Sequence, residues 1–278
     1  MSENKTVHLP YFDALFKDFQ KGKTEIIQSF GNHVHWGYWE NINTADASIE
    51  DFTQAAEKLS QKVYDSAKVT DNMRVLDCGC GFGGTISSLN NSFNNMQLIG
   101  LNIDPRQLAR AKEQVQPRAQ NHLEFIEANA CELPFEDNSF DTVLAVECIF
   151  HFPNRERFFQ EAYRVLKPGG TLAISDFVPR QIILPFIKIG SELAKDTIQK
   201  ALGDVDLNFS LGDYRKLSRN TGFTPLIEED ITQNTLPTYS LVRTLQKKED
   251  KIINFAERVS RWGVIRYLIL SYKKGNRE

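Results

Sequence analysis

An acidic residue followed by a glycine-rich run is the first feature of this sequence that could do chemistry. The apolar stretch 73–76 leads into Asp77, and the run from Gly79 to Gly84 reads G-C-G-F-G-G. Glycines let the backbone come close to a ligand, because no Cβ atom stands in the way. The spacing of Gly79, Gly81 and Gly84 also matches the dinucleotide fingerprint, so the glycines alone do not identify the ligand. A carboxylate here would repel a pyrophosphate and attract a cation, which favours a cationic ligand.

Two further residues with acid–base chemistry follow later apolar stretches. His151 comes shortly after 141–146, and Asp176 directly follows 171–175. Because parallel strands place their carboxyl ends at one edge of a sheet, we expect both side chains beside the glycine run. A histidine suits the role of general base, and a nearby carboxylate could orient it and stabilise its protonated form. The alternatives are a capping or core role for His151, and a substrate or loop-capping contact for Asp176.

The hydrophobic pattern predicts the elements that must position these residues. Short apolar stretches predict strands, and the continuous run at 141–146 is typical of a strand buried on both faces. Apolar residues at helical spacing predict amphipathic helices between them. The alternation of the two predicts an α/β fold with a seven-stranded sheet. The expected strands cover 73–76, 97–102, 123–128, 141–146, 171–175, 224–231 and 267–272, and the expected helices cover 11–19, 48–68, 85–93, 155–166, 178–202, 211–221 and 236–260.

Composition narrows the classes of protein that need to be considered. The 278 residues carry a net charge of −3 and 41% hydrophobic residues, which suits one large domain with a lid or insertion and argues against a nucleic-acid surface. Residues 1–10 are polar and lack a signal-peptide core, and no apolar run is long enough to span a bilayer. Four cysteines without disulfide-scaffold spacing favour a reduced, cytoplasmic protein. Cys78 with Cys80, and His33 with His35, lack the further ligands of a metal site, so we expect no metal.

Several stretches resemble one enzyme family. Residues 77–84 resemble the motif D-x-G-x-G-x-G, with which class I S-adenosylmethionine-dependent methyltransferases begin their cofactor site. Residues 129–141 are similar to the family's D-A-x-x-L-P-F-x-D-x-S-F-D stretch, and 164–172 read R-V-L-K-P-G-G-T-L, a structural signature of the family. Residues 35–39 resemble the H-x-G-Y-W segment of its small-molecule branch, which includes natural-product O-methyltransferases and quinone and tocopherol methyltransferases. The resemblance extends from about Tyr11 to the C-terminus and is loose after 178.

This resemblance implies a fold and a set of cofactor contacts. The fold would be a Rossmann-like, mostly parallel seven-stranded sheet with helices on both faces and a helical lid. The cofactor would be S-adenosylmethionine, with the glycine turn under its methionine portion, Asn102 and Gln107 at the ribose, and Asn129 with the next backbone amide at the adenine. Asn102 and Asn129 stand where the family usually has an acid, so both contacts would be altered. The candidate cofactor-binding residues are Tyr11, Trp39, Asp77, Gly79, Cys80, Gly81, Asn102, Ile103, Gln107, Asn129, Ala130 and Glu147.

The reaction that we expect is O-methylation of a hydroxyl on a small-molecule secondary metabolite. His151 would be the base and Asp176 its partner, and no magnesium is expected because no carboxylate cluster suits it. C-methylation of a quinol or an isoprenoid remains an alternative. An NAD-dependent oxidoreductase, which Asp77 and Asn102 disfavour, and a non-catalytic cofactor-binding module also remain open. The chain is expected to divide into a lid segment 1–70, a cofactor-binding core 71–177, a cap insertion 178–210 and the rest of the core, 211–278; the sequence predicts neither the acceptor nor the oligomeric state.

Overall fold

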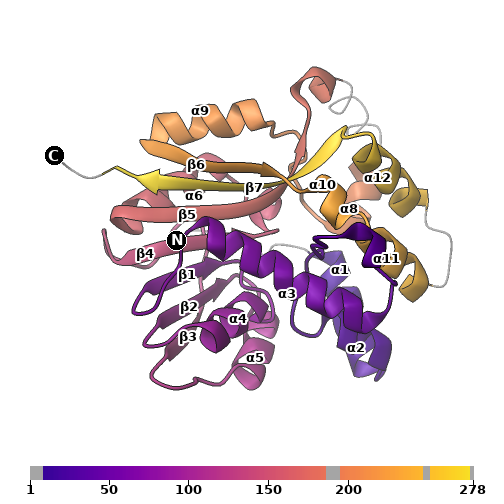
Figure 1. Ribbon diagram of the computed structural model, residues 1–278, viewed down its shortest axis with the longest axis horizontal. Helices are drawn as coiled ribbons and strands as arrows, with labels where there is room; N and C mark the ends of the chain where they lie inside the picture. The colour runs from indigo at the N-terminus through magenta and orange to yellow at the C-terminus, as the bar shows by residue number, and fades with distance from the viewer. Residues whose placement is uncertain (1–8, 186–194, 247–250, 276–278) are drawn as a thin grey trace.

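One seven-stranded sheet organises the described part of the chain. The computed structural model describes residues 9–185, 195–246 and 251–275. The strands lie in the order β3-β2-β1-β4-β5-β7-β6, and β7 runs antiparallel to both of its neighbours, whereas β1 to β5 run parallel (Figure 1). The strand bounds are β1 Arg74–Cys78, β2 Gln97–Asn102, β3 His122–Glu127, β4 Phe140–Val146, β5 Leu166–Pro179, β6 Phe223–Asp230 and β7 Ile265–Lys274. The predicted α/β fold with a mostly parallel sheet is therefore confirmed.

The sheet separates two hydrophobic cores, because successive side chains of a strand point to opposite faces. On β1, Val75 belongs to one core and Leu76 to the other. On β4, Val143 and Leu144 divide in the same way. Strands that supply both cores must be apolar at nearly every position, which is why the central strands are continuous apolar runs in the sequence.

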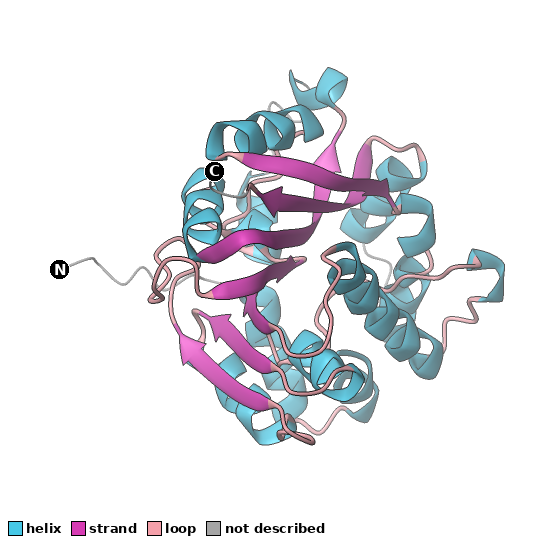
Figure 2. Ribbon diagram, turned by 60° about the vertical axis from the view of Figure 1, so that its left-hand side comes forward, coloured by secondary structure: helices cyan, strands magenta, loops and turns pink. Residues whose placement is uncertain are grey.

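Helices cover both faces of the sheet (Figure 2). α3 (Ile49–Ser66), α4 (Gly84–Ser92) and α5 (Pro105–Gln114) contact strands on one face, and α6 (Arg155–Val165) and α9 (Leu211–Thr221) contact β5 and β6 on the other. Side chains fix several helix starts; Asp104, for example, accepts a hydrogen bond from the Arg106 amide before α5. Asp104 is thus the N-cap of α5, and Pro105 is the first residue of the helix.

A second group of helices gathers beyond the carboxyl ends of the parallel strands. In Figure 1 these ends lie on the right, opposite the arrowhead of antiparallel β7, and the group lies around them. Its members are α1 (Pro10–Gln20), α2 (Thr24–Phe30), α8 (Lys195–Leu202), α10 (Thr232–Thr235), α11 (Thr238–Gln246) and α12 (Lys251–Arg261), with short 3₁₀ turns η1 (Ile42–Thr44), η2 (Ile149–His151) and η3 (Gln181–Ile183). Among the described residues, no helix combines the length and the apolar character that a membrane span needs.

The largest departure from the expected elements concerns β5. This strand continues to Pro179 instead of ending at Ser175, because long β7 pairs with it from Thr171 through Pro179. Residues 178 and 179, at the start of the expected cap, therefore belong to β5. Of the helix expected over 178–202, the structure shows η3 and α8, and 186–194 lie outside the described residues. Residues 247–250, within the region expected to be helical between 236 and 260, also lie outside them.

Candidate active site

A pocket at the carboxyl ends of β1 to β4 brings most of the predicted site residues together. Its wall comes from the turn after β1, the ends of β2 and β3, the β4–η2 segment, the start of α1 and residues 32–35. Trp39 and Asp176 are the predicted site residues that do not line it. Those that do are Tyr11, Asp77, Gly79, Cys80, Gly81, Asn102, Ile103, Gln107, Asn129, Ala130, Glu147 and His151.

The glycine turn has the backbone shape that its sequence requires. Gly79, Gly81 and Gly83 all have positive φ angles, of 75°, 56° and 83°, a region that favours glycine. A Cβ at Gly79 would come within 2.8 Å of Cys148, so packing also excludes a side chain there. A Cβ at Gly81 would have only the Gln107 side chain near it, at 4.0 Å, among the described residues. Gly81 therefore leaves backbone open to the pocket, as a cradle for a ligand would.

Asp77 contributes a buried carboxyl that lacks a partner. Its side chain is 1% exposed, and Oδ2 finds no hydrogen-bond partner among the described residues. Burial raises the pKa of Asp77 to about 8. A buried polar atom without a partner is costly, and a bound cation would remove that cost while returning the carboxyl to its ionised form. The site is thus complementary to a ligand with a positively charged group.

Asn102 and Gln107 form a linked pair at the end of β2. Asn102 Oδ1 accepts from the backbone amides of Ile103 and Asp104 at 2.7 and 3.2 Å, and its Nδ2 donates to Gln107 Oε1 at 3.0 Å. The amide carbonyl thus holds the turn, as a carboxylate would, while the amide nitrogen positions Gln107. One hydrogen of Asn102 Nδ2 stays available for a ligand hydroxyl.

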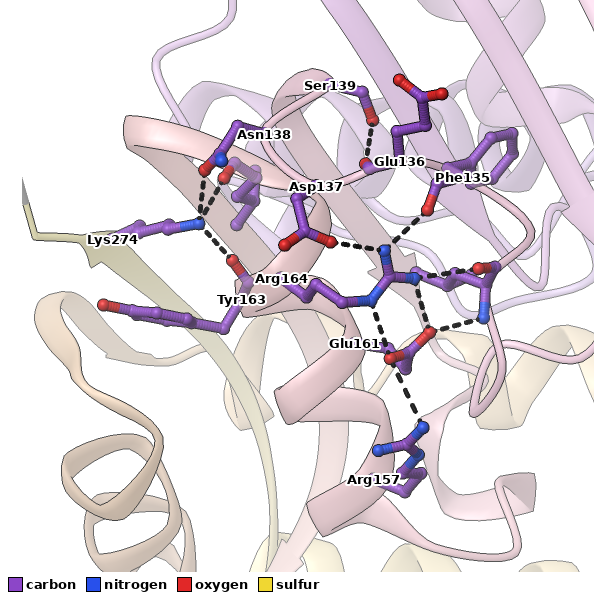
Figure 3. Close-up of polar contacts among 12 residues, drawn as sticks. Phe135, Glu136, Asp137, Asn138, Ser139, Arg157, Glu161, Tyr163, Arg164 and Lys274 are labelled. Carbon is purple, nitrogen blue, oxygen red and sulfur yellow. Dashed lines mark hydrogen bonds and ion pairs between the residues drawn. The ribbon is translucent and has the colours of Figure 1, made fainter.

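The loop after β3 is held by one arginine of α6. Asn129 Oδ1 accepts from the Cys131 amide at 2.9 Å, which fixes the start of the loop. Arg164 donates to the carbonyl oxygens of Leu133 and Phe135 at 2.9 and 2.6 Å, and also contacts Glu161 and Asp137 (Figure 3). Arg164 belongs to the 164–172 stretch, so it joins two stretches that the sequence shows separately, and residues 128–130 of the same loop line the pocket.

Glu147 joins three distant parts of the chain. It follows β4 with φ at 49°, a conformation that a non-glycine residue adopts rarely and that tends to occur at functional sites. Its Oε2 accepts from the Trp36 amide at 3.0 Å and from the Tyr267 hydroxyl at 2.5 Å. Burial raises the pKa of Glu147 to about 8. Glu147 therefore fastens the aromatic segment and β7 to the pocket edge.

The prediction that Trp39 contacts the cofactor does not fit the structure. Trp39 packs against Phe52 in a core cluster outside the pocket, and its indole nitrogen donates to Asp51 at 2.9 Å. His33 and His35, from the same aromatic segment, line the pocket instead. Residues 32–35 line the pocket, whereas at Trp39 the chain has left the pocket and packs in the cluster that contains Phe52 of α3, so one motif supplies both pocket wall and core.

The two histidines belong to a buried polar network. His33 Nδ1 and His35 Nε2 lie 3.0 Å apart, and His33 Nε2 lies 3.0 Å from Glu57 of α3. His35 Nδ1 must carry a proton because it faces the Trp36 carbonyl at 2.8 Å, and burial lowers the pKa of His35 to about 3. His35 is therefore neutral, and its Nε2 is an acceptor that faces both His33 Nδ1 and the Ser60 hydroxyl, each at 3.0 Å. The network holds the segment 32–36 against the glycine turn, where Gly84 leaves room for His33.

His151 is neutral, and its Nε2 carries the lone pair that can accept a proton. Its Nδ1 lies 3.3 Å from the Asp204 carbonyl oxygen, which can only accept, so Nδ1 carries the hydrogen. Nε2 lies 3.0 Å from the Tyr11 hydroxyl, which donates to it. Burial lowers the pKa of His151 to about 4, so the imidazole is uncharged at neutral pH. A neutral histidine with an accepting Nε2 at the pocket wall has the form that a general base needs.

Asp176, which was expected to orient His151, makes its hydrogen bonds to other residues in this structure. Asp176 is fully buried inside β5, where its carboxylate accepts from Arg155 at 3.2 Å, from Tyr214 at 2.5 Å and from the Phe177 amide at 2.8 Å. Because β5 continues past Asp176, this residue is not at a strand end, and its side chain points toward α6 and α9 instead of the pocket. The partner of His151 Nδ1 is the Asp204 carbonyl.

Arg155 connects this buried cluster to the base. It bonds Asp176 on one side and Asp206 on the other, and Asp206 in turn donates its amide to the Phe150 carbonyl. The cluster therefore holds the segment that carries the Asp204 carbonyl. Sequence reasoning missed Arg155 and the contact between Tyr11 and His151. The only sequence signal for Arg155 is that it lies close to His151 along the chain.

The pocket fits the cofactor that the motifs imply. S-adenosylmethionine carries an ammonium group and a sulfonium, and the pocket offers the unpartnered Asp77 carboxyl and the open backbone at Gly81. Asn102, Gln107 and Asn129 add polar groups at the ends of the next two strands. In the described part of the chain, no group of three or more His, Cys, Asp or Glu side chains is arranged to hold a metal ion.

Comparisons with known proteins agree with this chemistry. A family model described as a methyltransferase domain matches residues 76–174. The chain is 30% identical over 233 residues to methyltransferase GfsG of Streptomyces halstedii, which covers 82% of this chain and 80% of the relative. It is also 30% identical over 214 residues to the 27-O-demethylrifamycin SV methyltransferase of Amycolatopsis mediterranei, covering 77% and 74% of the two chains.

A solved structure shares the whole fold. The crystal structure of the [4+2]-cyclase SpnF superposes with a TM-score of 0.74 over 98% of both chains at 23% sequence identity, a level that bears on the fold alone. The relatives and the pocket together identify the family and the cofactor. The chain belongs to the class I S-adenosylmethionine-dependent methyltransferases.

Proposed function

We propose that this methyltransferase O-methylates a hydroxyl group of a small-molecule natural product, with His151 as the general base. The observation that carries the proposal is the protonation state of His151, whose Nδ1–H is committed to the Asp204 carbonyl and whose Nε2 accepts a proton at the pocket wall. An alcohol is a poor nucleophile until its proton is removed, so a base at this place matches O-methylation. The relative named for 27-O-demethylrifamycin SV supports the substrate class.

The residues divide the work between holding and proton transfer. When bound, S-adenosylmethionine supplies a methyl group activated by the adjacent positive sulfur. Asp77 would hold the positively charged part of the cofactor, while Asn102, Gln107, Asn129 and the Ala130 backbone would hold its nucleoside. His151 would accept the proton that the acceptor hydroxyl loses, and the Asp204 carbonyl would stabilise the resulting imidazolium through Nδ1–H. The helices over the strand ends would exclude water.

Two further expectations, on nucleic acid as an acceptor and on the cellular compartment, are also proposals. We infer that no nucleic acid is an acceptor, which the net charge of −3 supports. A reducing, cytoplasmic compartment is supported by four free cysteines.

A screen and one variant test the function. The protein is incubated with S-adenosylmethionine and a panel of hydroxylated natural products that includes 27-O-demethylrifamycin SV, and products are searched for a mass gain of one methyl group. Fragmentation that places the methyl on carbon would replace O-methylation by the C-methylation alternative. His151→Ala is expected to lower kcat by about 10²–10⁴, the usual range for a general base, with the cofactor Kd unchanged by calorimetry.

The matched control is His122→Ala, which removes an exposed histidine at the start of β3.

The pH–rate profile gives a second test of His151 as the base. Below its pKa, His151 is protonated and cannot accept a proton, so wild-type kcat should fall as the pH drops through about 4. A His151→Ala variant with full turnover would remove His151 from the mechanism.

A further inference from the structure

The lone pair of the proposed base is already occupied. Because His151 Nδ1 donates to a carbonyl and the ring is neutral, Nε2 is an acceptor, and the Tyr11 hydroxyl donates to it at 3.0 Å. Tyr11 is the donor at Nε2 among the described residues. An acceptor hydroxyl therefore has either to displace Tyr11 from His151 or to pass its proton through the Tyr11 hydroxyl. The Tyr11 oxygen keeps its own lone pairs, so it can accept a hydrogen bond while it donates one.

Packing holds Tyr11 in place. Its ring lies nearly parallel to the His151 ring, with 5.7 Å between centroids and 23° between planes, and it contacts Phe12 at 4.6 Å. The rest of α1 is anchored to the cofactor side, since Phe12, Phe16 and Phe19 each contact the Phe82 ring in the glycine turn. Displacement of Tyr11 would disturb this contact surface, which favours the second route.

The cavities indicate where the acceptor meets Tyr11. Besides the cofactor pocket, a second cavity of about 860 Å³ lies between α1, α2 and α11, a volume within the roughly 300–1,000 Å³ of small-molecule sites. Tyr11 and Val34 line both cavities. The second cavity is mostly apolar, with Leu15, Ile26, Phe30, Val242 and Leu245 in its wall. A bulky apolar acceptor in this cavity would present its hydroxyl to Tyr11 before it reached His151.

We propose that Tyr11 is a catalytic residue that relays the acceptor proton to His151. The inference rests on the proposed function. The acceptor O–H bond breaks as an O–H bond to Tyr11 forms, and the original Tyr11 O–H bond breaks as an N–H bond to His151 Nε2 forms. The electron pair left on the acceptor oxygen would form the new bond to the methyl carbon while the bond from that carbon to the sulfonium sulfur would break, with its electron pair staying on the sulfur. Tyr11 ends as it began. The two transfers are concerted, since burial raises the pKa of Tyr11 well above its usual value and disfavours a free phenolate.

Tyr11→Phe tests the relay, because it keeps the ring and removes the hydroxyl. With 27-O-demethylrifamycin SV or the panel member that turns over best, kcat should fall by about 10²–10³, within the range for lost proton transfer, while the cofactor Kd stays within twofold. The wild type should show a curved proton inventory in mixed H₂O and D₂O, indicating two protons in motion. Tyr64→Phe, which removes a buried hydroxyl on α3 outside the pocket, is the matched control and should keep full turnover.

A readout without an acceptor completes the test. In the wild type, ¹⁵N NMR should show His151 Nε2 as a hydrogen-bonded acceptor, and its resonance should move in Tyr11→Phe. An unmoved resonance would overturn the relay whether or not an acceptor is found. A Tyr11→Phe variant that turns over as fast as the wild type, or faster, would also overturn the relay. It would show that the Tyr11 hydroxyl only occupies the lone pair of His151. Full activity of His151→Ala would instead overturn the proposed function itself.

Discussion

The cofactor side and the acceptor side of the pocket are built in different ways. On the cofactor side, the shape comes from backbone conformation and from contacts between near neighbours in sequence, such as Asn102 with Gln107 and Asn129 with Cys131. On the acceptor side, the contacts join remote segments, such as Tyr11 with His151 and His151 with Asp204. The cofactor half therefore takes more of its shape from local contacts, whereas the acceptor half forms only when several elements are docked.

The largest expected effect is on stability and concerns the acceptor side. Arg155→Met leaves the Asp176 carboxylate buried without its cation, which should lower the free energy of unfolding by about 3–5 kcal/mol. Cofactor affinity should change little. Urea denaturation measures the loss, and the double variant Arg155→Met/Asp176→Leu should recover much of it. A single variant as stable as the wild type would show that the buried pair is not what joins β5 to α6.

Gly81→Val should break the cofactor side without unfolding it. The new side chain would enter the open pocket, so the Kd for S-adenosylmethionine should rise at least about 100-fold, or roughly 2.7 kcal/mol. Gly22→Val is the matched control, since Gly22 also has a positive φ and nothing within 4 Å of its Cβ. Both variants should lose similar thermal stability. Normal cofactor binding by Gly81→Val would make the turn a packing feature only.

Asp77 should couple cofactor binding to proton release. In the free protein the raised pKa, about 8, keeps Asp77 largely protonated at pH 7, and a bound cation favours the carboxylate. Binding should therefore release up to one proton, and affinity should rise with pH up to about 8. Calorimetry in buffers of different ionisation enthalpy measures the release.

Asp77→Asn should abolish this release and weaken binding about tenfold, which is about 1.4 kcal/mol. Glu147→Gln serves as the comparison, because burial raises the pKa of Glu147 to a similar value. Proton release that persists in Asp77→Asn and disappears in Glu147→Gln would move the cation site to Glu147.

The smallest expected effect concerns Trp39, which does not line the cofactor pocket. Trp39→Phe removes the hydrogen bond to Asp51 and should cost about 1 kcal/mol of stability. The cofactor Kd should stay within twofold of the wild type. A tenfold rise in Kd would restore Trp39 to the cofactor site.

The cofactor side was predictable because its causes are local. Positive φ angles require glycine at positions 79 and 81. Burial on both faces of the sheet requires the continuous apolar run of β4. Asp176 was expected at the end of a strand, but β5 continues past it. Where β5 ends depends on its pairing with β7, which lies far away in the sequence. In the aromatic segment 32–39, spacing alone does not reveal which side chains face the core. The contact between Tyr11 and His151 spans 140 positions, and no sequence pattern encodes it.

The sheet order also constrains when this enzyme becomes competent during synthesis. β7 lies between β5 and β6, so β6 leaves the ribosome earlier than the strand that joins it to the sheet. β7 also carries Tyr267, which bonds Glu147, and Lys274, which bonds the Tyr163 and Leu166 carbonyls. A nascent chain that ends before residue 265 therefore has the glycine turn but an unfastened pocket edge. Synthesis of β7 is therefore the step that fixes this edge of the pocket.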